Sequence, residues 1–508
     1  MILAGLDPNL LIDPIPMRLF FNSVCLCLLS WTVYAQQPLS TVQFSTEISG
    51  MASSARRTPF WLRANQFGTV PLIAPAGMIR LGSSGIFRRD SLGKGWFLGY
   101  GAEAVAIAGP NNRVILPEAY ARIGYRSIEL VVGRRKEVLG LVDTTLSSGS
   151  YSWSGNALPI TKIQLGTNGF VPLKFTKGLI SINAFFAHGW FPNTDSIQNS
   201  YLHQKALYGR IGKPHWKVKF YGGILHNAQW GGKSDYLAPI QAVNGKMPSS
   251  FKSYLSVVTS QQPANTSDYA FPDAVNRIGN HLGNMDIGAE ITIKNYTVLG
   301  YYQHPFEDKS GIALVNLPDG LYGIRLQNKA NTEDRFLKLK TITVEYLTTR
   351  DQSGATVKIN SPKYEGMDDY FNNIQYIDGW AVNERIIGTP FITRYKDTKP
   401  EWDTHLTPSK KNQGSMINNS LVSLYHFAFL GALRSGATIE ARLSISKNYG
   451  THWKRFPEDV TQTSSLVRFN LPVNWLGGSI IGLNLAMDQG SLYDNAVGGM
   501  ISFKKVWR

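Results

Sequence analysis

The sequence is poor in cysteine, in charge and in long apolar runs. It has two cysteines in 508 residues, Cys25 and Cys27, and only 17% of its residues are charged. Both cysteines lie in an N-terminal segment with the pattern of a secretory signal, so the mature chain would contain no cysteine and no disulfide. Beyond that segment, no run approaches the roughly 20 apolar residues of a membrane-spanning helix. These absences exclude a disulfide-rich scaffold and a bundle of membrane helices.

Residues 17–35 predict a secretory signal peptide. Arg18 precedes an apolar run, and small residues follow at the cleavage positions. The sixteen residues before this segment contain two aspartates and two prolines and make a poor leader. We therefore expect the true start at Met17, a leader and signal peptide over 1–35, and a single domain over 36–508.

The chain is strongly basic. Its formal charge is +16, and removing residues 1–35 takes away two aspartates and one arginine, which leaves +17. A polyanionic partner is therefore favoured. The cations are scattered in ones and twos without the signature of a nucleic-acid-binding fold, so we expect no nucleic acid. Acidic polysaccharide or the phosphates of lipopolysaccharide fit better.

Alternation of period two recurs over segments of about ten residues. Between 285 and 293 the odd positions are apolar and the even positions are polar or small, and the same split occurs at 437–445. One face of each segment is thus apolar and the other polar. With 12% aromatic residues and 48 glycines, this pattern suits strands that face lipid better than it suits a charged soluble surface.

The number of these segments indicates a large barrel. We count roughly 16 to 18, many of them flanked by Trp or Tyr as in aromatic girdles. The sequence predicts an all-β fold, a transmembrane antiparallel β-barrel of 16–18 strands that is a monomer in the outer membrane of a Gram-negative bacterium. The predicted strands start near Thr41, Gly77, Trp96, Leu116, Ser127, Ile160, Leu179, Tyr201, Trp216, Leu282, Tyr296, Leu321, Phe336, Leu421, Thr438, Leu466, Ile480 and Tyr493.

Three stretches do not alternate. Thr58 followed by Pro59 resembles a helix N-cap with proline at the first helical position, which predicts a short helix at the barrel mouth or in the lumen. The inserts 229–281 and 351–420 are long, and long loops are usually functional or disordered. In a barrel the long connections face outside the cell, so we expect these inserts to be surface loops or lids.

The run GRRKEVLGLVDTTLSSGSYSWSGNALPI, at 133–160, has the composition of a binding site. Cations lead into a Ser/Thr/Gly tract that holds Tyr151 and Trp153 and closes on Asn156. Sugar hydroxyls pair with Arg and Asn, and sugar C–H faces lie on aromatic rings. We expect this run to project from the wall and bind a polyhydroxylated ligand. The alternative is a turn between strands with its aromatics at a membrane interface.

Several blocks of sequence together resemble a known family. These are the run at 133–160 with TPFWLRANQFGTVP, HQKALYGRIG, GGILHNAQWGG, NRIGNHLGNMDIG and HPFEDKSGIALVNLPDGLYGI. They resemble the capsule assembly Wzi family as it occurs in Bacteroidetes, over nearly the whole mature chain. The resemblance implies an outer-membrane barrel that helps to hold or assemble capsular polysaccharide. Enterobacterial relatives have a helical plug and an occluded lumen, whereas here only the region of Thr58 could be helical.

We therefore predict a non-enzymatic protein that binds acidic glycan through basic and aromatic loops, with no cofactor and no metal. Its partners would be capsular or other acidic polysaccharide and outer-membrane lipid, including lipopolysaccharide. The predicted polysaccharide-binding residues are Arg134, Arg135, Tyr151, Trp153, Asn156, Trp230, Asn280 and His281.

Three other interpretations remain. The polar lumen face fits a general diffusion porin. His226 or His281 with Asp286 could serve a barrel hydrolase, although no G-x-S-x-G motif is present. The acidic group Glu307, Asp308 and Asp319 could bind Ca²⁺ or pair with Arg325 and other cations.

Overall fold

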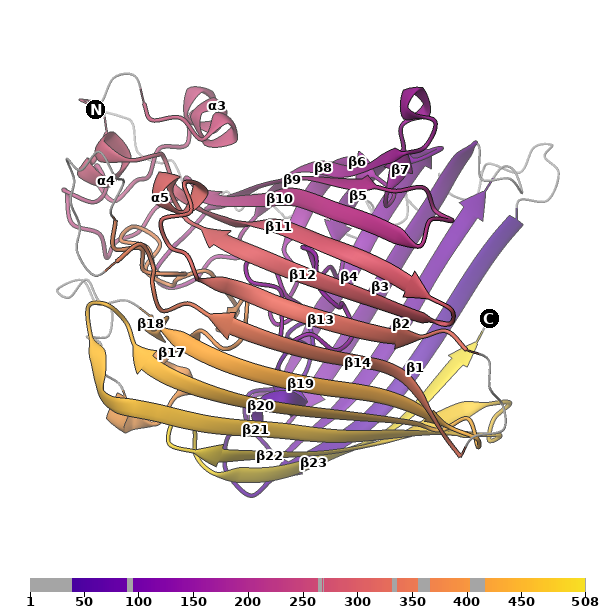
Figure 1. Cartoon of the computed structure of the whole chain (residues 1–508). Helices are drawn as coiled ribbons and strands as arrows, with labels where there is room; N and C mark the ends of the chain where they lie inside the picture. Colours follow the sequence, from indigo (N-terminus) through magenta and orange to yellow (C-terminus); the bar gives the residue numbers. More distant parts are fainter. Residues whose placement is uncertain are drawn as a thin grey trace, which may run out of the picture.

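The computed structural model describes residues 39–88, 95–263, 267, 269–330, 336–354, 366–402 and 416–507. They form a closed antiparallel β-barrel of 18 strands (Figure 1), which confirms the predicted fold class. The predicted signal peptide lies outside the described residues. The wall strands are β1 (Leu39–Ser53), β2 (Ala76–Arg88), β3 (Trp96–Ala108), β4 (Arg113–Tyr125), β5 (Ile128–Arg134), β6 (Thr161–Thr167), β8 (Ile180–Trp190), β9 (Tyr201–Ile211), β10 (Val218–Trp230), β11 (Asn280–Ile293), β12 (Tyr296–Phe306), β13 (Gly320–Asn328), β14 (Leu337–Thr348), β19 (Val422–Leu433), β20 (Thr438–Gly450), β21 (Arg455–Val473), β22 (Ser479–Gly490) and β23 (Ala496–Trp507). A further short strand, β7 (Val171–Pro172), pairs with β8 beside β6.

The barrel closes because β1 pairs with both β2 and β23. Ile48, for example, lies opposite Ile79 on one side and Phe503 on the other. Closure removes the free strand edges that would otherwise expose unpaired backbone groups. The two ends of the barrel differ. At the short-turn end, two-residue turns join β4 to β5 and β11 to β12. At the long-loop end, the connections span 54–75, 135–160, 231–279, 307–319 and 349–421.

Alternation along the strands produces one apolar and one polar face, as predicted. On β11, Ile287 and Ile291 are exposed on the outer face, whereas Asp286 points inward and is buried. On β20, Leu443 faces outward and Arg442 is buried inside. The outer face thus carries the apolar side chains that a bilayer requires.

The predicted strand starts agree with the structure except at β21. That strand begins at Arg455, eleven residues before the predicted start at Leu466. Residues 455–465 contain only two apolar side chains besides Pro457, those of Phe456 and Val460, so they carry no period-two signal. They nevertheless pair with β20, and the strand therefore extends past the apolar band.

Aromatic side chains mark both ends of the outer wall. At the long-loop end, Tyr302, Tyr322, Tyr346 and Tyr425 lie side by side on neighbouring strands, with ring centroids 4.4, 6.1 and 5.0 Å apart. At the short-turn end Trp96 packs beside Tyr125 in the same way. Rings in these positions suit the two membrane–water interfaces.

The helices are short. They are α2 (Phe60–Arg63), α3 (Phe251–Thr259), α4 (Phe271–Val275), α5 (Lys309–Ile312) and the 3₁₀ turns η1 (Lys174–Thr176), η2 (Tyr395–Asp397) and η3 (Pro400–Trp402). The predicted helix near Thr58 is α2, but Pro59 takes the N-cap position and Thr58 instead donates its hydroxyl to the Pro71 carbonyl. Among the described residues, no helix has the length and hydrophobicity of a membrane-spanning helix.

The long connections also contain four minor strands. They form two small antiparallel sheets, β15 (Ala381–Val382) with β16 (Arg385–Ile386), and β17 (Thr393–Arg394) with β18 (Ile417–Asn419).

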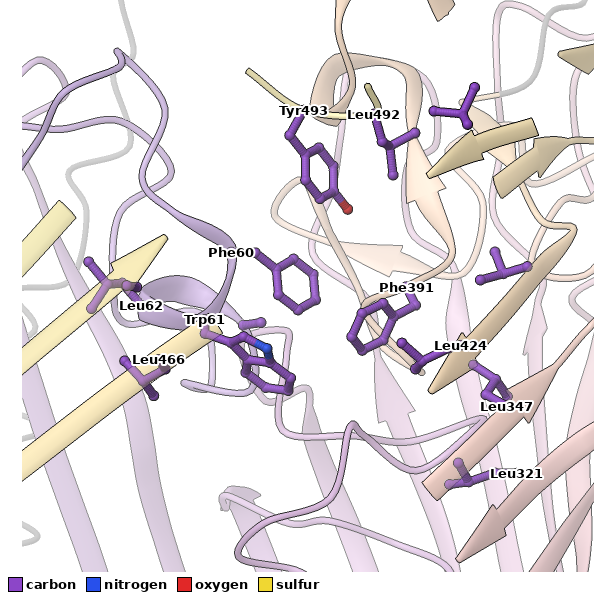
Figure 2. Packing of buried hydrophobic residues seen from close by; sticks show 14 of the residues in the cluster. Phe60, Trp61, Leu62, Leu321, Leu347, Phe391, Leu424, Leu466, Leu492 and Tyr493 are labelled. Atoms are coloured by element: carbon purple, nitrogen blue, oxygen red, sulfur yellow. The ribbon is translucent and has the colours of Figure 1, made fainter. Parts of the chain in front are cut away.

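Part of the barrel interior is an apolar core, which the sequence did not predict. Figure 2 shows Phe60 and Trp61 of α2 packed against Phe391 and Tyr493, with inward-facing leucines of the wall around them. The ring centroids of Phe60 and Phe391 lie 4.7 Å apart. Aromatic side chains from the loops therefore fill this part of the lumen.

Candidate functional site

The segment 135–160 lies inside the barrel. We call it the plug. It joins β5 to β6, yet it bonds to strands far away in the sequence, and Figure 1 shows loops between the near and far walls. The segment therefore leaves the wall, as expected, and projects inward, where the lumen supplies polar partners for its backbone.

Inward-facing polar side chains of the wall fix the plug. The Leu141 amide donates to Asp286 Oδ2 of β11 at 2.7 Å, and the Tyr151 amide donates to Gln303 Oε1 of β12 at 2.9 Å. The Ser148 amide donates to Glu345 Oε2 of β14 at 2.6 Å. Buried carboxylates that accept backbone N–H groups make strong, charge-assisted bonds, so they hold the plug in one conformation.

Three predicted binding residues lie together in the plug. Tyr151 is fully buried and packs on Phe371 at 5.2 Å between ring centroids. Trp153 contacts the Trp380 ring and lies under the Lys162 ammonium. Asn156 is buried and donates through Nδ2 to the Ile386 carbonyl at 2.9 Å. All three contribute to the packing between the plug and the connection 349–421.

The two predicted arginines lie at the junction of plug and wall. Arg134 donates through Nε to Thr161 Oγ1 at 2.9 Å. Arg135 forms ion pairs with Glu129 at 2.8 Å and Glu137 at 2.6 Å. Arg135 is thus neutralised within the barrel.

The last three predicted residues lie near one another at the long-loop end. Trp230 stacks on Tyr254, with ring centroids 5.1 Å apart. His281 Nδ1 lies 2.9 Å from His226 Nε2, and Asn280 is its neighbour on β11. The structure therefore separates the eight predicted residues into three places rather than one.

Asn280 and His281 line a pocket of about 250 Å³ at this end. We call it the rim pocket. Its other lining residues include Arg277, Glu307 and Asp308. Two buried donor atoms here, Asn280 Nδ2 and Arg277 Nε, have no hydrogen-bond partner among the residues that the structure describes. Unpaired buried donors cost free energy, so a ligand that accepts hydrogen bonds would be stabilised here.

The acidic group of the sequence organises the loops. Glu307 accepts a hydrogen bond from the Phe371 amide at 2.8 Å. Asp319 accepts hydrogen bonds from the amides of Asp351 and Gln352. Within the part of the chain that the structure describes, no three His, Cys, Asp or Glu side chains could hold a metal ion. The predicted pairing with Arg325 does not form, because Arg325 lies 3.9 Å from Glu290 instead.

Burial alters the acidity of these loop carboxylates. It raises the pKa of Asp319 to about 6. Burial and the nearby Asp308 carboxylate raise the pKa of Asp368 to about 8. The same burial raises the pKa of Glu307 well above its usual range. Glu307 and Asp368 therefore carry less negative charge at neutral pH than two exposed carboxylates would.

The proposed hydrolase residues do not form a triad. Ser260 Oγ lies 3.3 Å from His226 Nε2, but the same nitrogen also lies 2.9 Å from His281 Nδ1. Asp286 bonds to Asn284 and the plug. In a catalytic triad, one histidine ring nitrogen bonds to the nucleophile and the other bonds to the acid.

The sequence did not predict one cluster of cationic residues. A cavity of about 310 Å³, which we call the cationic cleft, is lined by Arg57, Arg113, Arg394 and Lys396 together with two acidic residues. These cations come from the connection before α2, the first residue of β4 and the connection 349–421. Only a weak signal existed, the Arg56–Arg57 pair, because the other cations are far away in the sequence.

The fold is of the outer-membrane β-barrel class. One solved structure of this class that the chain resembles is Wzi, an outer membrane protein involved in group 1 capsule assembly in Escherichia coli and a carbohydrate-binding β-barrel. The TM-score is 0.56 at 14% identity, over 91% of this chain and 84% of that one. This similarity shows the fold alone.

Weaker similarity extends to two Pseudomonas aeruginosa proteins. OpdK and OccK5 (OpdH) each align over 92% of this chain at 8% identity, covering 99% and 97% of their own chains, with TM-scores of 0.46 and 0.45. No protein-family model matches the sequence. No curated protein matches it significantly. Membership of the Bacteroidetes Wzi type therefore stays a prediction.

Proposed function

We propose that this protein is a non-enzymatic outer-membrane barrel that binds acidic polysaccharide at the cell surface and takes part in capsule assembly or attachment. The observation that carries the proposal is the rim pocket, in which the buried donors of Asn280 and Arg277 have no partner in the described part of the chain. Similarity to a barrel that binds carbohydrate supports it at the level of the fold.

The orientation follows from the two ends of the barrel. Both ends of the wall, the start of β1 and the end of β23, lie at the short-turn end. In bacterial barrels the short turns face the periplasm and the longer loops face outside. The rim pocket would then open at the cell surface.

The chemistry of the rim pocket suits sugar hydroxyls. Each hydroxyl both donates and accepts a hydrogen bond. Asn280 Nδ2 and Arg277 Nε offer donors, and the Glu307 and Asp308 carboxylates offer acceptors. The Cα and Cβ of Trp230 lie beside Gly279, which lines this pocket. Tyr151, Trp153 and Asn156 could contact polysaccharide only if the plug moved, and their assignment stays a prediction.

The packed interior favours binding over free diffusion. The plug and α2 fill the lumen with buried side chains that are bonded to the wall. A general diffusion porin needs a water-filled passage. The protein could therefore act as a porin only if the plug left the lumen.

Deleting the gene tests the proposal. We expect capsular polysaccharide to appear in the medium while export continues, because the surface site that retains it is gone. Complementation with Asn280→Ala should retain less polysaccharide than the wild type. Loss of one hydrogen bond is worth about 1 kcal/mol, or about fivefold in affinity. Cell-bound capsule is measured against capsule in the medium.

Asn328→Ala is the matched control. It makes the same change at the short-turn end, at the last residue of β13. It should restore wild-type retention. Unchanged cell-bound capsule in the deletion strain would contradict the proposed function.

A further inference from the structure

The cationic cleft lies on the lumen side of the wall. Ala76 at the start of β2 and Ile107 near the end of β3 both line it, and both belong to a buried cluster. The outward-facing residues of β2, such as Ile79 and Leu81, are exposed on the opposite face of the strand. The cleft is therefore separated from the lipid face by the wall itself.

Arg394 is the unusual residue in this cleft. Its side chain lines the cavity although the residue is only 6% exposed. Among the described residues, Arg394 has no hydrogen-bond or ion-pair partner, and its Nε is buried and unpaired. A buried charge without a partner is strongly destabilising. A structural arginine would be expected to have a carboxylate or carbonyl beside it.

The neighbouring groups do not neutralise Arg394. Asp397 already pairs with Arg57, which also donates to the Lys396 carbonyl at 2.7 Å. Behind the cleft, Arg385 donates only to backbone carbonyls, those of Arg63 and Val70. The site therefore has an excess of positive charge.

The protonation equilibria agree with this excess. Burial, with the charge of Arg63, lowers the pKa of Arg385 to about 9. Burial alone would raise the pKa of Asp397, but the charges of Arg57, Arg63, Arg394 and Arg385 lower it. The Asp397 carboxylate thus lies among several guanidinium groups. Glu384, the other acidic residue of the cleft, is exposed and lies 3.9 Å from the equally exposed Lys396, so a further anion beside the guanidinium groups would be stabilised.

We infer that the cationic cleft is a subsite for the carboxylate of an acidic sugar residue, which Arg394 binds with Arg57, Arg113 and Lys396 around it. The planar guanidinium matches a carboxylate in a two-bond arrangement that Lys cannot reproduce. This inference rests on the proposed function and adds the acidic part of the ligand, whereas the rim pocket suits its hydroxyls.

A soluble polymer fits this cleft better than a membrane lipid. The phosphates of lipopolysaccharide lie at the lipid-facing surface, but the cleft is lined by inward-facing residues such as Ile107. A chain of sugars at the barrel mouth could place one residue in the cleft while the rest stays in water. Lipopolysaccharide binding is therefore an alternative outcome of the test.

The test measures binding of oligogalacturonate and of its neutral methyl ester to the full-length mature barrel in detergent micelles. Wild type should bind the acid at least tenfold more tightly than the ester. Arg394→Gln should weaken binding of the acid tenfold or more and leave the ester unchanged. Lys454→Gln, which removes one exposed cation at the same end outside the cleft, should change either affinity less than twofold.

Thermal unfolding distinguishes a ligand-binding from a structural role. Removing an unpartnered buried charge should leave the melting temperature of Arg394→Gln unchanged or raise it. A lower melting temperature would overturn the inference, and so would equal binding of acid and ester. It would also fail if Arg394→Gln lost affinity for lipopolysaccharide but kept affinity for oligogalacturonate.

The two proposals fail separately. If the barrel retains capsule on cells but Arg394→Gln binds oligogalacturonate normally, the carboxylate subsite is wrong and the proposed function stands. If Arg394 governs binding of the acid but deletion of the gene leaves capsule on the cells, the proposed function is wrong.

Discussion

At the scale of single residues, Asp368 couples the connection 349–421 to pH. It accepts hydrogen bonds from the hydroxyls of Ser353 at 2.7 Å and Ser310 at 3.4 Å. Its pKa rises from the ordinary 3.8 to about 8, chiefly through burial and then through the Asp308 carboxylate. The folded loop therefore holds this proton more tightly than the unfolded loop does.

The sign of the pH effect follows from that difference. Below about pH 4 the proton on Asp368 makes its full contribution to the stability of the folded loop. This contribution is lost as the pH rises through about 8. We expect hydrogen exchange over 349–354 and 366–372, corrected for its intrinsic pH dependence, to be slower at pH 5 than at pH 8. The neutral variant Asp368→Asn should show a smaller difference. An equal difference in variant and wild type would assign the effect to other groups, such as Glu307.

At the scale of elements, the wall could be predicted from the sequence and the plug could not. A strand such as β20 shows its apolar and polar faces in consecutive residues, so a local pattern is sufficient. The partners of the plug are remote: Ser148 meets Glu345, and the carbonyl of Thr145 meets Arg442. Gly and Ser in the plug therefore indicated an exposed loop.

The candidate site shows the same limit. Asn280 and His281 were identified from their sequence block and do line a pocket. Arg394 lies in a long insert whose fold has no local signal, and it meets Arg57 only where the connections 54–75 and 349–421 come together. Burial, which distinguishes Arg394 from the other cations that line the cleft, cannot be read from a scattered charge pattern.

Removing the plug should open the lumen. Gly133 and Lys162 are paired across β5 and β6, so a short Gly/Ser linker can replace 137–158 without separating these strands. We expect the wild-type barrel to show little steady conductance in planar bilayers and the plug deletion to conduct. Side chains that fill part of the interior, including Tyr151 and Trp153, would be gone, and the residues of the connection 349–421 that pack on them would lose their support.

Deletion of α3 is the control for plug removal. Figure 1 places this helix beyond the ends of the wall strands. Its loss should leave conductance at the wild-type level. Steady conductance through the intact protein would instead favour the porin alternative.

At the scale of the whole molecule, charge should govern how polysaccharide binds. The chain carries a formal charge of +16, which attracts a polyanion over a distance that salt shortens. A polymer also presents many acidic residues, so one bound residue raises the effective concentration of the next. Long-range attraction and the cationic cleft therefore act together.

Salt titration separates these contributions. Binding of the purified barrel to the host's acidic polysaccharide should weaken at least tenfold between 50 mM and 500 mM NaCl, because exposed charges are screened at the higher salt. The same polymer with its carboxylates reduced to alcohols should bind more weakly and lose its salt dependence. It would still offer hydroxyls to the rim pocket, where Asn280 Nδ2 is buried and less sensitive to screening. If binding of both polymers were independent of salt, charge would not contribute to the affinity, and recognition of the hydroxyls would explain binding by itself.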